Sequence, residues 1–166
     1  MNLRRTPEFF SGAGLIVLAW ITWQALYGPE RLPARIPTHF DAAGNPNGWG
    51  SPSDLWMLPV IDAGVYLLMT AIVRFPEAFN YPVEVTEVKR AELERITIGM
   101  IGWMKAEMVW LFCSIQWIII ALARGPSGSI HQSMVMVFVL CSLVVIFATV
   151  GWHIWAMRRA ARPAKA

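Results

Sequence analysis

The chain has 166 residues, of which 56% are hydrophobic and 15% are charged, and it contains nine tryptophans. This composition is too apolar for an ordinary soluble domain of this length and suits a single unit embedded in a membrane. The formal net charge of +3 does not indicate a nucleic-acid partner, because the basic residues cluster beside apolar runs, where they set topology and contact anionic lipid.

The first predicted element is a membrane-spanning helix over about residues 9–27, which follows Arg4 and Arg5. Its apolar stretch is long for the hydrophobic region of a signal peptide, and no small-x-small cleavage site follows it. We therefore expect an uncleaved signal anchor that stays in the protein.

A loop over residues 28–51 follows, and it carries the motif LPARIPTHFDAAGNPNGWGS. Pro33 and Pro37 fix their own φ angles and push the residues before them into extended backbone. The dipeptides Asn45-Pro46 and Asn47-Gly48 predict that the chain reverses direction twice within a few residues. We expect an ordered loop between the first two membrane helices.

The end of this loop is marked by Ser51, Pro52 and Asp54. In this order they are typical of an N-cap, a first helical residue and the acidic residue of a capping box. The next helix is therefore predicted to begin at about Pro52.

His39 and Asp41 are the candidate chemical groups of the loop. Two residues apart in an extended strand, they lie on one side and supply two metal ligands, with Asp54 or His131 as further ligands. The structural alternative is that His39 bonds loop carbonyls and Asp41 caps turn amides. We favour this alternative over a metal site, because turn-rich loops commonly use Asp in this way, and we expect no metal and no cofactor. We also expect no catalytic residue, since no serine-nucleophile motif occurs.

The motif resembles the signature of a family of membrane domains of unknown function that also form the N-terminal part of SdpI-type toxin immunity proteins. A weaker similarity continues to Lys105, and the chain departs from the pattern at Pro52, where a basic residue is common. The resemblance implies protection against a membrane-active peptide. The residues that carry it are Leu32, Pro33, Ile36, Pro37, His39, Phe40, Gly44, Pro46, Gly48, Trp49, Gly50 and Ser51.

Three further apolar runs each reach the roughly 20 residues that span a hydrocarbon core of about 30 Å. The charged connection over 76–95 is predicted to lie outside the membrane, with its second half as a solvated extension of the third helix. The two cysteines fall inside apolar runs and give no disulfide framework. The predicted spans are about 54–75, 96–123 and 130–157, and the cysteines are Cys113 and Cys141.

The basic residues predict the orientation of the four helices. Ten of the fourteen lysines and arginines fall before the first helix, at the connection between the second and third, or after the fourth, and only three fall in the other two connections. Positive residues favour the cytoplasmic side. We expect a plasma-membrane protein with both termini in the cytoplasm and the motif loop outside.

Asp62 and Gln116 are the polar residues expected in the outer half of the bundle. At 1.5 Å per residue, Asp62 lies about 10 Å below the outer boundary and Gln116 lies at a similar depth. An ionisable residue there is costly unless it faces the interior. We expect a hydrogen bond between the two that joins helices two and three, or the floor of an outward-opening vestibule with His39 and Asp41 as its lid.

Lys105 and Glu107 are predicted to lie just inside the cytoplasmic boundary of the third helix. There Lys105 extends to the lipid headgroups, and Glu107 meets Arg74. We interpret both as interfacial anchors, although the resemblance includes Lys105.

Together these features predict an all-α, polytopic membrane protein with four transmembrane helices and an ordered extracytoplasmic loop. The expected function is non-enzymatic binding or protection at the outer face, with the lipid bilayer and an extracytoplasmic peptide or another membrane subunit as partners. The alternatives are a small transporter or channel subunit, for which paired charges inside the membrane are the expected sign, and a membrane enzyme, which requires a catalytic constellation.

Overall fold

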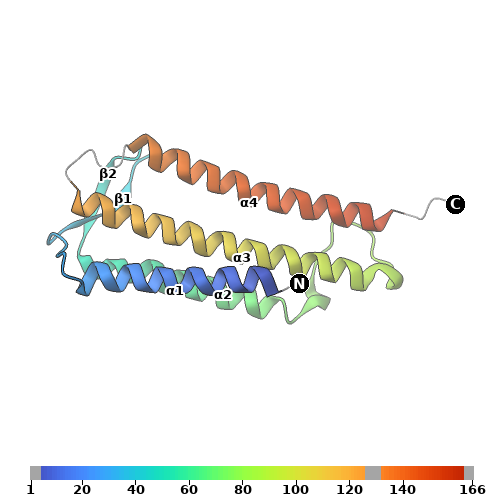
Figure 1. The fold of residues 1–166 in the computed structure, drawn as a ribbon. Helices are drawn as coiled ribbons and strands as arrows, with labels where there is room; N and C mark the ends of the chain where they lie inside the picture. The colour runs from blue at the N-terminus through green and yellow to red at the C-terminus, as the bar shows by residue number, and fades with distance from the viewer. Residues whose placement is uncertain (1–4, 126–131, 163–166) are drawn as a thin grey trace.

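The computed structural model describes residues 5–125 and 132–162, and this part of the chain is mostly helical (Figure 1). It contains four helices that are long and apolar enough to cross a membrane, as the apolar runs predict. The helices are α1 (Arg5–Tyr27), α2 (Met57–Ile72), α3 (Glu87–Arg124) and α4 (Gln132–Ala161), with short 3-10 helices η1 (Pro52–Trp56) and η2 (Pro76–Ala78).

Helix α3 is the longest element, with 38 residues. It begins at Glu87, well before the predicted span over 96–123, because the charged segment after Thr86 is helical and continuous with the apolar run. At 1.5 Å per residue its length is about 57 Å, which exceeds a hydrocarbon core of about 30 Å. At its start, α3 therefore extends past α1 (Figure 1).

The expectation of an all-α protein is wrong in one segment, because the motif loop forms a two-stranded antiparallel sheet. Strand β1 (Ile36–Phe40) pairs with β2 (Pro46–Gly50). The chain reverses once, between Asp41 and Asn45, and the predicted turn dipeptide Asn47-Gly48 lies inside β2. Gly44 explains this choice of turn, since its φ of 82° is a conformation that favours glycine.

The helices surround α3, which packs against each of the other three. Figure 1 shows α1 and α2 along one side of α3 and α4 along the other, with the β-hairpin at one end of the bundle. The start of α3 and the end of α4 lie at the opposite end, and α1 begins part of the way toward it. We call these the hairpin end and the terminal end.

Close packing of α1 on α3 depends on a small residue. A Cβ atom added at Gly14 would lie 2.5 Å from a methyl carbon of Val109, so any larger residue would force the helices apart. The Sγ of Cys113 donates a hydrogen bond of 3.1 Å to the Gly14 carbonyl. Small residues at such crossings let helix backbones approach in membranes, where no hydrophobic force drives association.

Helix α4 exposes most of its apolar surface. Its side chains that point away from α3 are exposed, a pattern that suits contact with lipid, since a soluble monomer rarely shows a large apolar patch. Exposed apolar residues on α4 are Val137, Phe138, Leu140, Leu143, Val144, Val145, Phe147, Trp152 and Trp155.

Candidate functional site

Apolar residues of the motif anchor the hairpin to the helices. Ile36, at the start of β1, is 0% exposed. It belongs to a buried cluster at the hairpin end, and Leu32 and Phe40 pack against the same cluster. Leu32, Ile36 and Phe40, which are spaced four apart in the motif, therefore fix the hairpin on α1, η1 and α3. The other buried members are Ala25 of α1, Leu55 of η1, and Ile119 and Ile120 of α3.

Asp41 holds the turn of the hairpin. Its carboxylate accepts hydrogen bonds from the backbone amides of Asn45 at 2.8 Å and Ala43 at 2.9 Å, and from the Asn45 side chain at 3.2 Å. The Asn45 backbone bond, followed by the Asn45 side-chain bond, lowers the pKa of Asp41 below its ordinary value of 3.8. Asp41 therefore caps the amides of the turn, as the structural interpretation of this residue predicts.

His39 bonds a side chain and not the predicted loop carbonyls. Its Nδ1 is hydrogen-bonded to Oδ1 of Asn47 on the paired strand. Gly48 lies opposite, where an added Cβ would be 2.8 Å from the His39 Cβ. Within residues 5–125 and 132–162, no three His, Cys, Asp or Glu side chains gather as a metal site. His131, the other suggested ligand, lies outside the described residues.

The end of the hairpin shows the predicted capping box, with Ser51 as the N-cap and Asp54 as its acidic residue. Asp54 Oδ2 accepts a hydrogen bond of 2.9 Å from the backbone amide of Ser51, and the Ser51 hydroxyl lies 3.1 Å from Asp54 Oδ1. Of the motif prolines, Pro37 is buried, Pro33 is exposed and Pro46 pairs with Phe40 across the hairpin. These residues shape the loop and its junction with η1.

A cavity of about 560 Å³ lies between the hairpin, the start of α2, α3 and α4. It brings together three residues of the predicted vestibule, His39, Asp41 and Gln116, but Asp62 does not line it. Most of its wall is apolar, and the hairpin supplies its polar groups together with Asp54 and Gln116. The apolar lining includes Ile36, Phe40, Leu55, Leu58, Ile115, Ile118, Ile119, Val135 and Val139.

Gln116 is fully buried at one wall of this cavity. Its Nε2 donates to the hydroxyl of Thr22 on α1 and to the carbonyl of Leu55, both at 2.9 Å. The predicted bond between Gln116 and Asp62 is therefore absent. Gln116 Oε1 has no hydrogen-bond partner among the described residues, so it keeps an acceptor beside the cavity.

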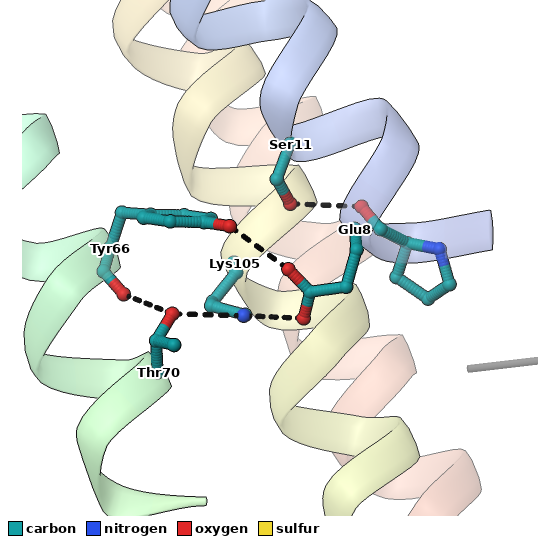
Figure 2. Close-up of polar contacts among 6 residues, drawn as sticks. Glu8, Ser11, Tyr66, Thr70 and Lys105 are labelled. Atoms are coloured by element: carbon teal, nitrogen blue, oxygen red, sulfur yellow. Dashed lines mark hydrogen bonds and ion pairs between the residues drawn. The ribbon is translucent and has the colours of Figure 1, made fainter. Parts of the chain in front are cut away.

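A second polar cluster lies nearer the terminal end, around Lys105. The Lys105 side chain is 2% exposed, so it does not extend along the surface to headgroups as predicted. Its Nζ lies 2.5 Å from Glu8 Oε1, 3.1 Å from the Thr70 hydroxyl and 4.7 Å from the centre of the Tyr66 ring. Figure 2 shows the Lys105 amine between Glu8 of α1 and Thr70 of α2, with the Tyr66 hydroxyl bonded to the other carboxylate oxygen of Glu8.

Glu8, Tyr66 and Thr70 are functional residues that were not predicted from the sequence. The Tyr66 hydroxyl donates to Glu8 Oε2 at 3.0 Å, so α1, α2 and α3 meet in one network. A signal was present in the sequence: Asp62, Tyr66 and Thr70 lie four residues apart, a spacing that puts all three on one helix face. Glu8 carried no such signal, because it is 97 residues from Lys105.

Glu107 also differs from its prediction. Its carboxylate is hydrogen-bonded to the hydroxyl of Thr149 on α4, in place of the expected contact with Arg74. The Thr149 carbonyl lies 2.7 Å from Nδ1 of His153, so these groups join α3 to α4 on the side away from Lys105.

Comparisons with known proteins find a family model and a relative that match part of the chain. A family model described as a domain of unknown function (DUF1648) matches residues 14–61, which cover the end of α1, the hairpin and the start of α2. The chain is 29% identical over 110 residues to an uncharacterised protein of Archaeoglobus fulgidus. The match covers 57% of this chain and 59% of that protein, and no solved structure matches the chain.

Proposed function

We propose that this chain is an integral membrane protein that binds an amphipathic ligand at its hairpin end without catalysing a reaction. The observation that carries the proposal is the cavity of about 560 Å³ beside the motif hairpin. Its size lies within the roughly 300–1,000 Å³ of ligand sites, which are mainly apolar with a few polar groups. The cavity and the part of the chain matched by the family model share the hairpin.

The chemistry of the wall indicates the class of ligand. Aliphatic side chains and Phe40 suit a hydrocarbon tail or the apolar side chains of a peptide. The free acceptor of Gln116 suits a buried N–H or O–H donor on that ligand. The resemblance to immunity proteins favours a membrane-active peptide as this ligand, and protection of the producing cell as the outcome.

The test is survival of a sensitive host exposed to a secreted membrane-active peptide, with and without this chain. A tryptophan at Val139, which lines the cavity, should fill it and abolish protection. A tryptophan at Val137 on the same helix, 59% exposed, is the matched control and should leave protection intact. Equal protection by both variants, or none by the unmodified chain at normal membrane abundance, would contradict the proposal.

A second candidate function is transport, and one observation favours it. Paired charges inside a membrane bundle are the sign expected of transporters, and the buried Lys105 pairs with Glu8. Proteoliposomes that contain the chain should then move protons or a charged solute, which a pH-sensitive dye trapped inside them would report. A leak equal to that of empty liposomes would remove this candidate.

A further inference from the structure

Asp62 is a buried acid that the proposed binding site does not use. It lies in α2 and is 1% exposed, and neither carboxylate oxygen has a hydrogen-bond partner among the described residues. The Cys113 thiol of α3 donates its hydrogen bond to the Gly14 carbonyl and not to Asp62.

The groups around Asp62 leave an ionised carboxylate without compensation. Lys105 is the one buried lysine or arginine among the described residues, and Glu8 already neutralises it at 2.5 Å. A buried charge without a counterion or donor is strongly unfavourable, and such a group becomes neutral instead. A carboxyl becomes neutral by binding a proton. The surroundings of Asp62 therefore favour its protonated form.

Polar residues lie on one face of α2 from Asp62 toward the terminal end. Tyr66 lies one turn further along α2, about 6 Å in rise, and Thr70 lies one turn beyond it. The Tyr66 hydroxyl bonds Glu8, and the Thr70 hydroxyl accepts from Lys105 (Figure 2). Glu8 is 46% exposed, so this row of polar groups begins at a side chain that water reaches.

We propose that Asp62 is a proton-binding site inside the α1–α2–α3 interface, and that it exchanges its proton along the polar face of α2 toward Glu8. The titratable groups around it are Tyr66 on its own helix, Cys113 and Lys105 on α3, and Glu8 on α1. This site differs from the cavity at the hairpin end, so either proposal can fail without the other.

The test uses the full chain in lipid nanodiscs and the apolar reagent dicyclohexylcarbodiimide. A protonated carboxyl adds its O–H across one C=N bond of this reagent, and the product rearranges to a stable acylurea with no atom lost. Peptide mass spectrometry should find the adduct on Asp62 at about pH 6 and its loss at about pH 9, where the site has released its proton. Glu8, which is paired with the Lys105 amine, should react far less.

Two variants complete the design. Asp62→Asn should remove the adduct and also the infrared carbonyl band of a protonated carboxyl, whereas Glu107→Gln, on the opposite side of α3, should leave both unchanged. Because the adduct is measured on the unmodified protein, a failure of Asp62→Asn to fold does not affect the result. No adduct on Asp62 at about pH 6, or the same adduct yield at about pH 9, would overturn the proposal.

Discussion

At the scale of single residues, Asp41 decides whether the hairpin turn is ordered. Its lowered pKa means that the carboxylate stabilises the turn at all pH values above its ordinary value of 3.8. This contribution is lost as the pH falls through the lowered folded-state pKa. The turn should therefore be insensitive to pH throughout the physiological range.

A spin label at Ala42 tests this prediction. Its motion should be slow and constant from about pH 7 to about pH 5, and it should increase only below about pH 4. Asp41→Ala should show fast motion at every pH, because the Asn45 and Ala43 amides lose their acceptor. A mobility that changes between about pH 7 and pH 5 would assign the turn to another group.

The second residue-scale prediction concerns Gly50. An added Cβ there would lie 2.1 Å from Asp54 Oδ2 and 2.8 Å from the Thr38 methyl carbon, so Gly50→Ala should disrupt the hairpin junction. Overpacking typically costs about 1–3 kcal/mol, which a thermal unfolding curve in detergent would report. Gly12→Ala is the control, since nothing lies within 4 Å of its added Cβ. Equal unfolding temperatures for the two variants would contradict this packing.

At the scale of elements, the Glu8–Lys105 pair joins the start of α1 to the middle of α3. Removal of one partner of a buried pair costs about 3–5 kcal/mol, because a buried charge remains uncompensated. Glu8→Gln should therefore lower the folded yield and the unfolding temperature sharply, because the Lys105 side chain, 2% exposed, is left without its counterion. The exchanged pair Glu8→Lys with Lys105→Glu should recover much of that loss.

An exposed ion pair provides the matched control. Arg124 and Glu30 lie 3.4 Å apart, with side chains 32% and 75% exposed. Such pairs contribute about 0–1 kcal/mol, so Arg124→Met should change stability little. If Glu8→Gln were as harmless as Arg124→Met, the Lys105 cluster would not hold these helices together.

The helices and the motif differ in how far the sequence predicts them. Apolar runs of sufficient length predict membrane helices directly, because every backbone group in a bilayer must be paired within the segment. The hairpin depends on which distant residues pair. Asn47-Gly48 reads as a turn locally, yet the Asp41 bonds and the φ of Gly44 place the reversal earlier.

The candidate site shows the same division. The sequence predicts Asp62 and Gln116 as interior groups from depth alone, but it does not give the rotation of each helix, which decides the partner. That rotation directs Gln116 to Thr22 and Lys105 to Glu8. The four-residue spacing of Asp62, Tyr66 and Thr70 can be seen in the sequence. The contribution of α1 depends instead on how α1 packs against α3, where Gly14 lies against Val109.

At the scale of the whole molecule, the two polar regions lie apart along the bundle. The cavity adjoins the hairpin, and the Lys105 cluster lies toward the terminal end, where Glu8 is exposed. The positive residues favour the cytoplasm for the terminal end. A protein with this orientation would offer a ligand site to the outside and a charged network to the inside.

The proposed topology is tested most directly by finding on which side of the membrane the hairpin and the start of α3 lie. Single cysteines at Ala42 in the turn and at Glu92 near the start of α3, both exposed, should be introduced into a chain without Cys113 and Cys141. An impermeant thiol reagent added to intact cells should label the cysteine at Ala42 and should label the cysteine at Glu92 only after the membrane is opened. Labelling of both from the outside would contradict a four-helix membrane protein with its hairpin outside and its termini in the cytoplasm.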